Sequence, residues 1–304
     1  MEELPLNDCM KFWKSSENMN PAYEKLKVLS VTGGVQKHLE LIDRSLSDEE
    51  NIRRLCFLAD GPLANEFDRI FLEVFGVRNE IYKLITKRLS QGSANQEELL
   101  LFTGKEKSGD MSGYLSEMLA AGFVSRDYTW HLDPFKVSKL SRYRLKDNYT
   151  RFYYKIILPN KSKVQSGFFV DPLAGLPEWD SIMGLQFDNL ILNNKEMIFQ
   201  KLGISLEDIV YANPYFQRET NKQQECQIDL LVHTKDKVLH VCELEYSMSP
   251  VGPQIINEVK AKIANIALPK SFSCRPALIH VNGVSDEVIQ SGYFSTIIDF
   301  NDLC

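Results

Sequence analysis

The chain has 304 residues, of which 44% are hydrophobic and 25% are charged, and its formal net charge at pH 7 is −6. This acidic balance argues against a protein that simply coats nucleic acid, and the length favours two or three domains over one. The sequence contains no run of 18 apolar residues that would predict a transmembrane helix, and its acidic start is not typical of a secretory signal. We therefore expect a cytoplasmic protein of ordinary globular composition.

Six cysteines are spread over the whole chain, and no two of them are separated by only two residues. Scattered cysteines in a chain of this length are not typical of a disulfide-rich secreted module or of a zinc site. We expect reduced thiols.

Residues 1–90 are predicted to form a helical, lid-like segment. Apolar residues recur at helical spacing, most clearly over residues 63–89. Ser47 and Glu50 have the spacing of a capping box, in which each side chain accepts a hydrogen bond from the other residue's backbone amide. The pair Gly33-Gly34 indicates a turn between helices.

Residues 91–150 are predicted to form a winged helix. Helical patterns cover residues 95–102 and 111–121, with a polar turn between them. Strand-like alternation follows at residues 123–130 and again at 141–145. The order of helix, turn, helix and two-stranded hairpin is typical of a winged helix.

The C-terminal part, residues 181–304, is predicted to be an α/β domain with a central mixed sheet. An irregular linker over residues 151–180, which contains three prolines, would join it to the winged helix. The fold class expected for the whole chain is therefore multidomain, α and α/β. The elements expected in the C-terminal part are helices at 181–201 and 252–267 and strands at 209–217, 226–233, 238–246, 276–282 and 295–300.

Two acidic residues lie on neighbouring predicted strands of that domain. Asp229 belongs to one strand and Glu243 to the next, and a hairpin between the strands would bring the two carboxylates together. Mg²⁺ prefers oxygen ligands, so the pair would hold a Mg²⁺ ion that polarises a phosphate and activates water. This layout resembles the metal site of the restriction-endonuclease-like, or PD-(D/E)XK, nucleases.

One position departs from that nuclease pattern. The lysine expected two residues after Glu243 is replaced by Glu245, which has the opposite charge but can act as a general base. Lys260 or Lys262, on the following helix, would supply the missing cation if that helix faces the site. Asp188, on the preceding helix, is a further candidate acid. In the alternative, Asp188 is a helix surface residue, the other acids are solvated charges at strand ends, and the domain does not cleave.

A basic segment covers residues 136–163, where nine Lys and Arg residues accompany one acidic residue, Asp147. Cations on the hairpin can bind phosphates, and neighbouring aromatic rings can stack on bases. In the alternative, the arginines point outward from a strand and the aromatic rings pack in the interior. The candidate nucleic-acid-binding residues are Lys136, Lys139, Arg142, Arg144 and Lys146, and the aromatic candidates are Tyr143, Tyr149, Phe152, Tyr153 and Tyr154.

Four strings, in this order, resemble the C-terminal part of the archaeal-type AAA/STAND ATPases: Val31–Leu39, Leu115–Val124, Ser141–Phe152 and the acidic pair. The resemblance implies a lid-like helical segment, a winged helix and a restriction-endonuclease-like domain, without the family's P-loop ATPase core. Residues 104–109 contain the residue types of a P-loop in the wrong order, so we expect no nucleotide site in this chain. The chain departs from the family at Gln36, where the family has proline, and at Asp188, where it has glutamate.

Two functions of different classes follow from these patterns. In the first, the chain is a C-terminal fragment of such an ATPase and carries a winged helix and a degenerate Mg²⁺-dependent nuclease-like domain that acts on nucleic acid such as DNA, either by cleaving it or by binding it without cleavage. In the second, it is a non-catalytic regulatory or protein-interaction module that works with a separately encoded ATPase core. The winged helix and the α/β domain would then bind the partner, and exposed apolar surface on the helical segment would predict self-association. The basic segment favours the first function, whereas the replaced lysine and the acidic balance favour the second.

Overall fold

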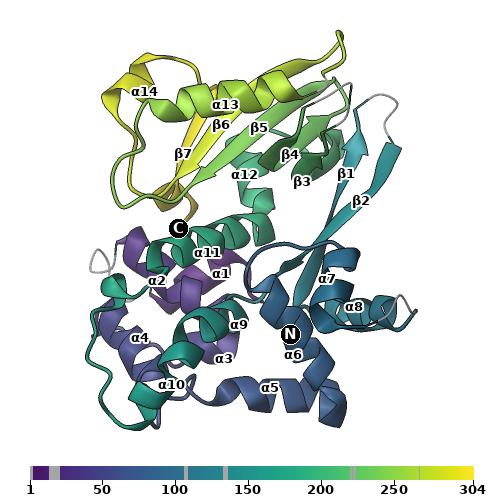
Figure 1. Cartoon of the computed structure of the whole chain (residues 1–304). Helices are drawn as coiled ribbons and strands as arrows, with labels where there is room; N and C mark the ends of the chain where they lie inside the picture. Colours follow the sequence, from purple (N-terminus) through teal and green to yellow (C-terminus); the bar gives the residue numbers. More distant parts are fainter. Residues whose placement is uncertain are drawn as a thin grey trace. The chain divides into compact units, whose positions relative to one another are not determined.

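The computed structural model describes residues 3–13, 21–105, 109–132, 136–219, 221, 224–266 and 268–304 (Figure 1). The chain divides into two compact units. Unit 1 comprises Met1–Arg126 and Arg142–Leu190, and unit 2 comprises Asp127–Ser141 and Ile191–Cys304. Among the residues so described, no helix has both the length and the apolar character needed to cross a membrane.

Unit 1 is mainly helical, as the periodicity predicts. The predicted capping box is present: Ser47 Oγ accepts a hydrogen bond from Glu50 N at 3.3 Å, and Glu50 Oε2 accepts one from Ser47 N at 2.8 Å. The predicted glycine turn is present as well. Gly33 has a φ of +59°, and a Cβ on Gly34 would lie 2.5 Å from the carbonyl oxygen of Leu4. The first helices are α1 (Leu6–Cys9), α2 (Ala22–Thr32), α3 (Gln36–Leu39), α4 (Asp48–Cys56), α5 (Glu66–Phe75) and α6 (Glu80–Leu89).

Two stretches with continuous helical patterns are each divided into two helices. Between α5 and α6, Gly76 has a φ of +65°, a conformation that favours glycine and ends a helix. The helix predicted over residues 181–201 is α11 (Trp179–Asn193) followed by α12 (Lys195–Lys201). The break falls at Asn194, whose short polar side chain has a low helix propensity.

The segment expected to be an irregular linker is helical in its first half. α9 (Asn148–Phe152) continues into a π-helix (Tyr153–Ile157) and then into α10 (Leu158–Gln165). Pro159 indicated a break in the sequence, but it lies at the start of α10, directly after the π-helix, and the helical run continues through it. The prediction of an irregular segment is therefore wrong for residues 151–165.

The order of elements predicted for residues 91–150 is present. It consists of α7 (Gln96–Thr103), α8 (Asp110–Ala120), and a two-stranded hairpin of β1 (Val124–His131) and β2 (Lys136–Leu145). The turn predicted at residues 104–109 lies partly outside the described residues. The base of the hairpin belongs to unit 1, and residues 127–141 belong to unit 2.

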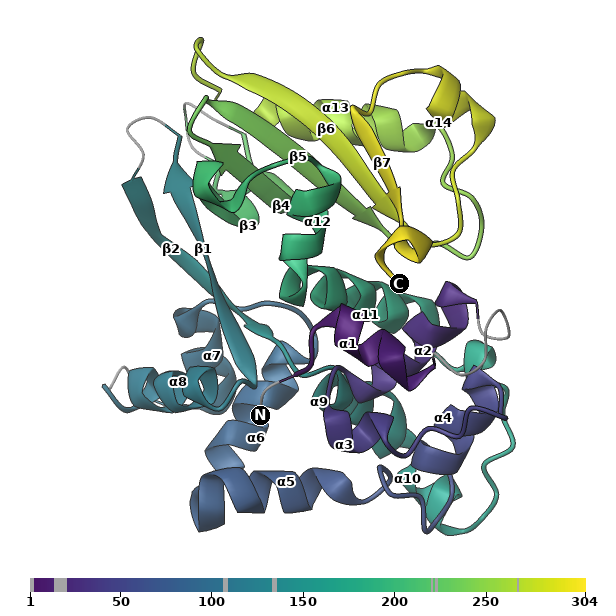
Figure 2. The same cartoon turned by 180° about the vertical axis from the view of Figure 1, so that it is seen from behind.

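Unit 2 contains a mixed five-stranded sheet, as predicted, with strand order β3-β4-β5-β6-β7 (Figure 2). β3, β4 and β5 pair in antiparallel fashion, whereas β5, β6 and β7 are parallel. α13 covers one face of the sheet and α12 lies on the other (Figures 1 and 2). The remaining elements are β3 (Ile209–Gln217), β4 (Cys226–Thr234), β5 (Val238–Glu245), α13 (Gln254–Asn265), β6 (Ser273–His280), α14 (Asp286–Gln290) and β7 (Thr296–Asp299).

Candidate functional site

The two acids singled out in the sequence lie together at one end of the sheet in unit 2. The antiparallel register that pairs Leu230 with Cys242 places Asp229 on β4 beside Glu243 on β5. Asp229 Oδ2 accepts a hydrogen bond from the backbone N–H of Leu244 at 3.0 Å. Glu243 is 4% exposed, so its carboxylate is almost wholly removed from water. The hairpin therefore joins two carboxylates in a largely buried position.

A lysine from α13 completes this acid pair. Lys262 Nζ donates a hydrogen bond to Glu243 Oε1, and its side chain is 30% exposed. The apolar contacts of α13 explain why Lys262 faces the acids. Ile255 and Val259 belong to the core of unit 2, and residue 262 continues the same helical face. Lys260 lies elsewhere on the helix, with its Nζ 5.2 Å from the centre of the Tyr293 ring. Of the two lysines considered from the sequence, Lys262 is thus the one at the acids.

The electrostatics of the site follow from burial and from the repulsion between acids. Burial raises the pKa of Asp229. Burial and the charge of Asp229 raise the pKa of Glu243 to about 7. Burial also raises the pKa of the partly exposed Glu245, with a further contribution from Asp229. Burial alone would lower the pKa of Lys262, but the surrounding carboxylates outweigh it and the pKa is raised. The site therefore favours binding of a cation or a proton.

One buried oxygen of the site suits a metal ion. Glu243 Oε2 has no hydrogen-bond partner within the part of the chain that the structure describes. A buried acceptor of this kind is costly unless it is paired, and a hard cation or a proton would pair it. Among the described residues, no group of three or more His, Cys, Asp or Glu is arranged to hold a metal. The acid pair would therefore leave most ligand positions to water and substrate, as Mg²⁺ sites commonly do.

The raised pKa of Glu243 predicts an unusual dependence of stability on pH. The ordinary value is 4.5 and the folded value is about 7, so the folded state binds more protons between these values than the unfolded state does. The free energy of unfolding of the metal-free protein should fall as pH rises from about 4.5 to about 7, by at most about 3 kcal/mol. Urea unfolding in EDTA across this range should show the fall in the wild type. Glu243→Gln should show a smaller fall, because only the raised pKa values of Asp229 and Glu245 then contribute to it. An equal slope in both proteins would contradict the assignment.

Asp188, the further candidate acid, lies in unit 1, whereas Asp229 and Glu243 lie in unit 2. Within unit 1 its charge acts on the buried guanidinium of Arg151. Burial and the nearby Arg144 lower the pKa of Arg151 to about 10, and Asp188 opposes this change. This interaction gives Asp188 a role in unit 1, and its participation in the metal site remains a prediction.

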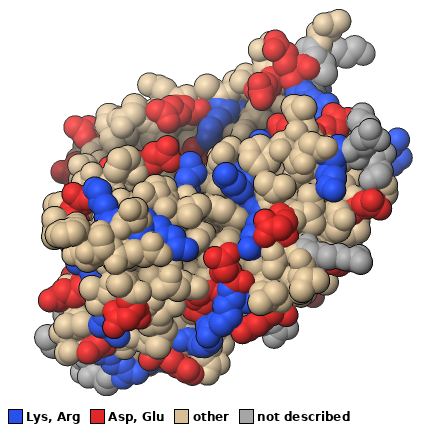
Figure 3. Space-filling view, turned by 60° about the horizontal axis from the view of Figure 1, so that its bottom comes forward, with Lys and Arg blue, Asp and Glu red and all other residues tan. Residues whose placement is uncertain are grey.

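The five cations predicted to bind nucleic acid differ in their surroundings. Arg142 donates to the carbonyl oxygen of Ser93 at 2.8 Å and also pairs with Glu98, and Arg144 donates to Asn189. These contacts support a structural role for both arginines. Lys136 and Lys139 are exposed, and Lys146 is half-buried. On the face drawn in Figure 3, basic and acidic side chains are interspersed.

Four of the five aromatic candidates pack in the interior of unit 1, and Tyr154, which is partly buried, donates its hydroxyl hydrogen to the carbonyl oxygen of Lys83 at 2.8 Å. Tyr143, Tyr149, Phe152 and Tyr153 are at most 6% exposed. The ring of Tyr153 stacks on Phe67 with 4.0 Å between ring centres. This burial confirms the structural interpretation of these rings and leaves them unable to stack on bases.

The distal part of the hairpin, residues 127–141, is anchored within unit 2 by Trp130. This side chain is 2% exposed and its ring centre lies 5.0 Å from that of Tyr211. Its Nε1 donates a hydrogen bond to His233 Nδ1 at 3.2 Å. Trp130 and Leu132, both from the first strand side of the hairpin, therefore belong to the core of unit 2, which a hairpin that inserts freely into a nucleic-acid groove would not do. The sequence alone gave no sign of this contact.

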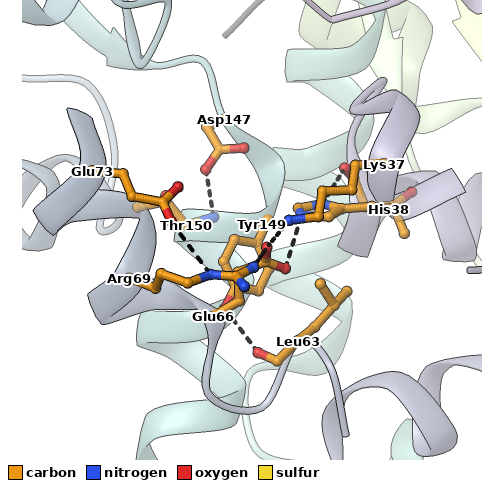
Figure 4. A network of polar contacts seen from close by, with 10 residues as sticks. Lys37, His38, Leu63, Glu66, Arg69, Glu73, Asp147, Tyr149 and Thr150 are labelled. Atoms are coloured by element: carbon orange, nitrogen blue, oxygen red, sulfur yellow. Dashed lines mark hydrogen bonds and ion pairs between the residues drawn. The ribbon is translucent and has the colours of Figure 1, made fainter.

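A second polar network, centred on the buried Glu66 and His38 in unit 1, was also not anticipated from the sequence (Figure 4). The carboxylate of Glu66 contacts His38 Nε2 at 3.2 Å and Lys37 Nζ at 3.3 Å, and it also pairs with Arg69. Tyr149 packs its ring edge-on against His38 with 5.3 Å between ring centres. The network links residues from α3, α5 and α9, so it joins helices that are far apart in the sequence.

No family model matches the chain. The chain is similar to a curated protein of Methanocaldococcus jannaschii that is described as an uncharacterized protein, MJECL04, with 28% identity over 148 residues. That match covers 48% of this chain and 32% of the relative, so the chain spans about a third of the relative's length. Among solved structures, protein VC1899 from Vibrio cholerae matches with a TM-score of 0.31 and 12% identity, over 81% of this chain and 53% of that one. A TM-score this low assigns no fold.

Proposed function

We propose that unit 2 is a Mg²⁺-dependent nuclease domain of the PD-(D/E)XK type, within the C-terminal part of an archaeal-type AAA/STAND ATPase that also carries a winged helix. The single observation that supports this most strongly is the position of Lys262. Its ammonium group lies on the carboxylate of Glu243, beside Asp229, although the residue comes from a helix and not from the strand. Lys262 thus supplies the positive charge that the nuclease pattern expects from a lysine at position 245, where this chain has glutamate.

Each residue of this site has a role in phosphodiester hydrolysis. Asp229 and Glu243 would hold Mg²⁺, which stabilises charge on the phosphate and makes a bound water more acidic. Lys262 supplies positive charge where negative charge develops in the transition state. Glu245 is partly exposed and its pKa is raised, so its carboxylate can accept a proton from the attacking water. We propose DNA as the substrate, with the exposed Lys136 and Lys139 contacting its phosphates.

A second candidate function is that of a protein-interaction module working with a separately encoded ATPase core. Exposed apolar side chains on unit 1 favour it. Val77 and Leu101 are 89% and 87% exposed, and Leu72 on α5 is 53% exposed. Large exposed apolar side chains commonly mark contact surfaces. The apolar surface is in unit 1 and the acid site is in unit 2, so variants of different residues test the two functions separately.

The nuclease proposal is tested by incubating plasmid DNA and single-stranded DNA with the purified chain in Mg²⁺ or Mn²⁺. We expect cleavage that EDTA stops and that Asp229→Ala lowers to the level of a protein-free control. Asp236→Ala is a matched control, because Asp236 is exposed and lies in the turn of the β4–β5 hairpin, at the end away from Asp229 and Glu243. Absence of cleavage by a folded wild-type protein, or equal cleavage by Asp229→Ala, would refute the nuclease and leave the interaction module.

A further inference from the structure

A buried histidine lies on β6, the strand next to β5 of the acid site in unit 2. His280 ends β6, is 4% exposed, and pairs in parallel register with Glu245 on β5. Residues paired in this way project their side chains from the same face of a sheet. Leu278, two residues earlier, pairs with Glu243 and belongs to the core that α13 covers. His280 therefore lies on the same face as the acids and Lys262.

Two groups meet at one nitrogen of this histidine. The backbone N–H of Gly283 donates to His280 Nδ1 at 3.1 Å, and Asp299 Oδ2, on β7, lies 3.9 Å from the same nitrogen. Gly283 adopts a φ of +85°, a conformation that favours glycine, as the chain turns back toward the ring. Gly283 N–H suits the neutral ring, in which Nδ1 is an acceptor, and Asp299 suits the charged ring, in which Nδ1 carries a proton. The hydrogen bond from Gly283 therefore belongs to the neutral ring, and in the charged ring Asp299 takes the place of Gly283 as the partner of Nδ1.

The loop that carries Gly283 is held in place by the loop that follows β5. Val251 N donates to the Gly283 carbonyl oxygen at 3.0 Å, and Ser285 N donates to the Val251 carbonyl oxygen at 2.9 Å. The loops that follow β5 and β6 are therefore hydrogen-bonded to each other, and together they hold the Gly283 N–H against the histidine ring. With Nδ1 engaged, Nε2 is the nitrogen that remains for a substrate.

The order of the strands places His280 and Lys262 on different sides of the acids. Cys226, at the start of β4, contacts the carbonyl oxygen of Lys262, whereas His280 belongs to β6. Glu243 and Glu245 lie on β5, between these two strands. In an in-line displacement at phosphorus the attacking and leaving oxygens lie on opposite sides. The residue that accepts a proton from the attacking water and the residue that protonates the leaving oxygen must therefore be different.

We propose, resting on the nuclease function above, that His280 is a catalytic residue that protonates the leaving oxygen of the cleaved phosphodiester and that Asp299 stabilises its charged form. A water oxygen forms a bond to phosphorus while the bond from phosphorus to the leaving oxygen breaks, and its electron pair stays on that oxygen. His280 Nε2 gives its proton to this oxygen, which leaves as an alcohol. Glu245 accepts the proton of the water, and exchange with solvent restores both groups. The products are a phosphomonoester and an alcohol.

The acidic surroundings of His280 support this role. Among the residues that the structure describes, Glu245 on β5 pairs with His280, and Asp299 on β7 and Asp302 after β7 act on its charge. Burial lowers the pKa of His280, and Asp299 and Asp302 partly oppose this change. A bound phosphodiester, which is itself an anion, would favour the charged ring further.

The test compares oligonucleotides that contain either an ordinary phosphodiester or a bridging phosphorothiolate, with sulfur in place of the leaving oxygen, at one linkage. A thiolate leaves without a proton, so loss of a general acid should slow cleavage only of the ordinary linkage. We expect His280→Asn to slow cleavage of the oxygen linkage by about 100-fold and that of the sulfur linkage by less than about threefold. Asp299→Asn should have the same selectivity with a smaller effect.

His240→Asn is the matched control, because His240 is also buried, at 6% exposure, but lies three residues from Glu243 on β5 and hence on the other face of the sheet. It should cleave both linkages like the wild type. Equal slowing of both linkages by His280→Asn would show that the histidine only supports the structure, and no slowing would show that it has no role. Failure of the wild type to cleave either oligonucleotide would instead refute the nuclease function, and this inference with it.

Discussion

Replacing Lys262 with methionine is expected to slow Mg²⁺-dependent DNA cleavage by about 10²–10³-fold, the usual effect of removing one group that stabilises transition-state charge. Methionine keeps most of the apolar length of the side chain and removes only the ammonium group that pairs with Glu243. The loss should appear mainly in kcat, because the cation is needed where charge develops during the reaction. Initial rates of plasmid nicking in saturating Mg²⁺ would measure it.

Lys260→Met provides the control for this experiment. This substitution is on the same helix and removes the same charge from the protein. The ammonium group of Lys260, however, lies over the Tyr293 ring and not at the acids. Its variant should cleave at close to the wild-type rate. If both variants lost the same activity, the effect would reflect general attraction of DNA to positive charge, and Lys262 would have no particular place in the site.

The sequence predicted the acid pair because a hairpin has a fixed geometry. Two strands separated by a short turn must pair, so Asp229 and Glu243 were expected to meet, and the register places them side by side. The choice between Lys260 and Lys262 could not be made in the same way. It depends on which face of α13 packs on the sheet, and that is decided by contacts of residues such as Ile255 and Val259 with distant strands.

Other parts were missed because their signals were not local. Pro159 indicated a break, but its effect depends on its position within α10. His280 lies on a predicted strand, yet its proximity to the acids arises from parallel pairing across a crossover that includes α13. The contact of Trp130 with His233 joins residues that are 103 positions apart. Periodicity identifies elements, whereas pairing across long separations decides which side chains meet.

The two units should respond to acid in opposite directions. In unit 2, the raised pKa of Glu243 makes stability decrease as pH rises toward about 7. In unit 1, burial alone would raise the pKa of Glu66, but His38, Arg69 and Lys37 outweigh it and bring the pKa to about 2. A carboxylate with a lowered pKa contributes its full stability above its ordinary value of 4.5, and that contribution is lost as pH falls toward about 2.

Replacing Glu66 with alanine is therefore expected to destabilise unit 1 by about 1–3 kcal/mol at pH 7, because it leaves the buried His38 ring without its carboxylate partner. His38 and the neighbouring cations would lose their shared carboxylate, and His38 is only 2% exposed. Hydrogen exchange of the amides in α3 and α5 would measure the change without interference from unit 2.

Glu73→Ala is the matched control: its carboxylate lies 3.8 Å from Arg69 but is 67% exposed, so its loss should cost less than about 1 kcal/mol. Similar exchange in the two variants would show that the network of Glu66 does not hold these helices together. The difference between the variants should also shrink as the pH falls below 4.5, because the wild-type carboxylate then loses its advantage in the folded state.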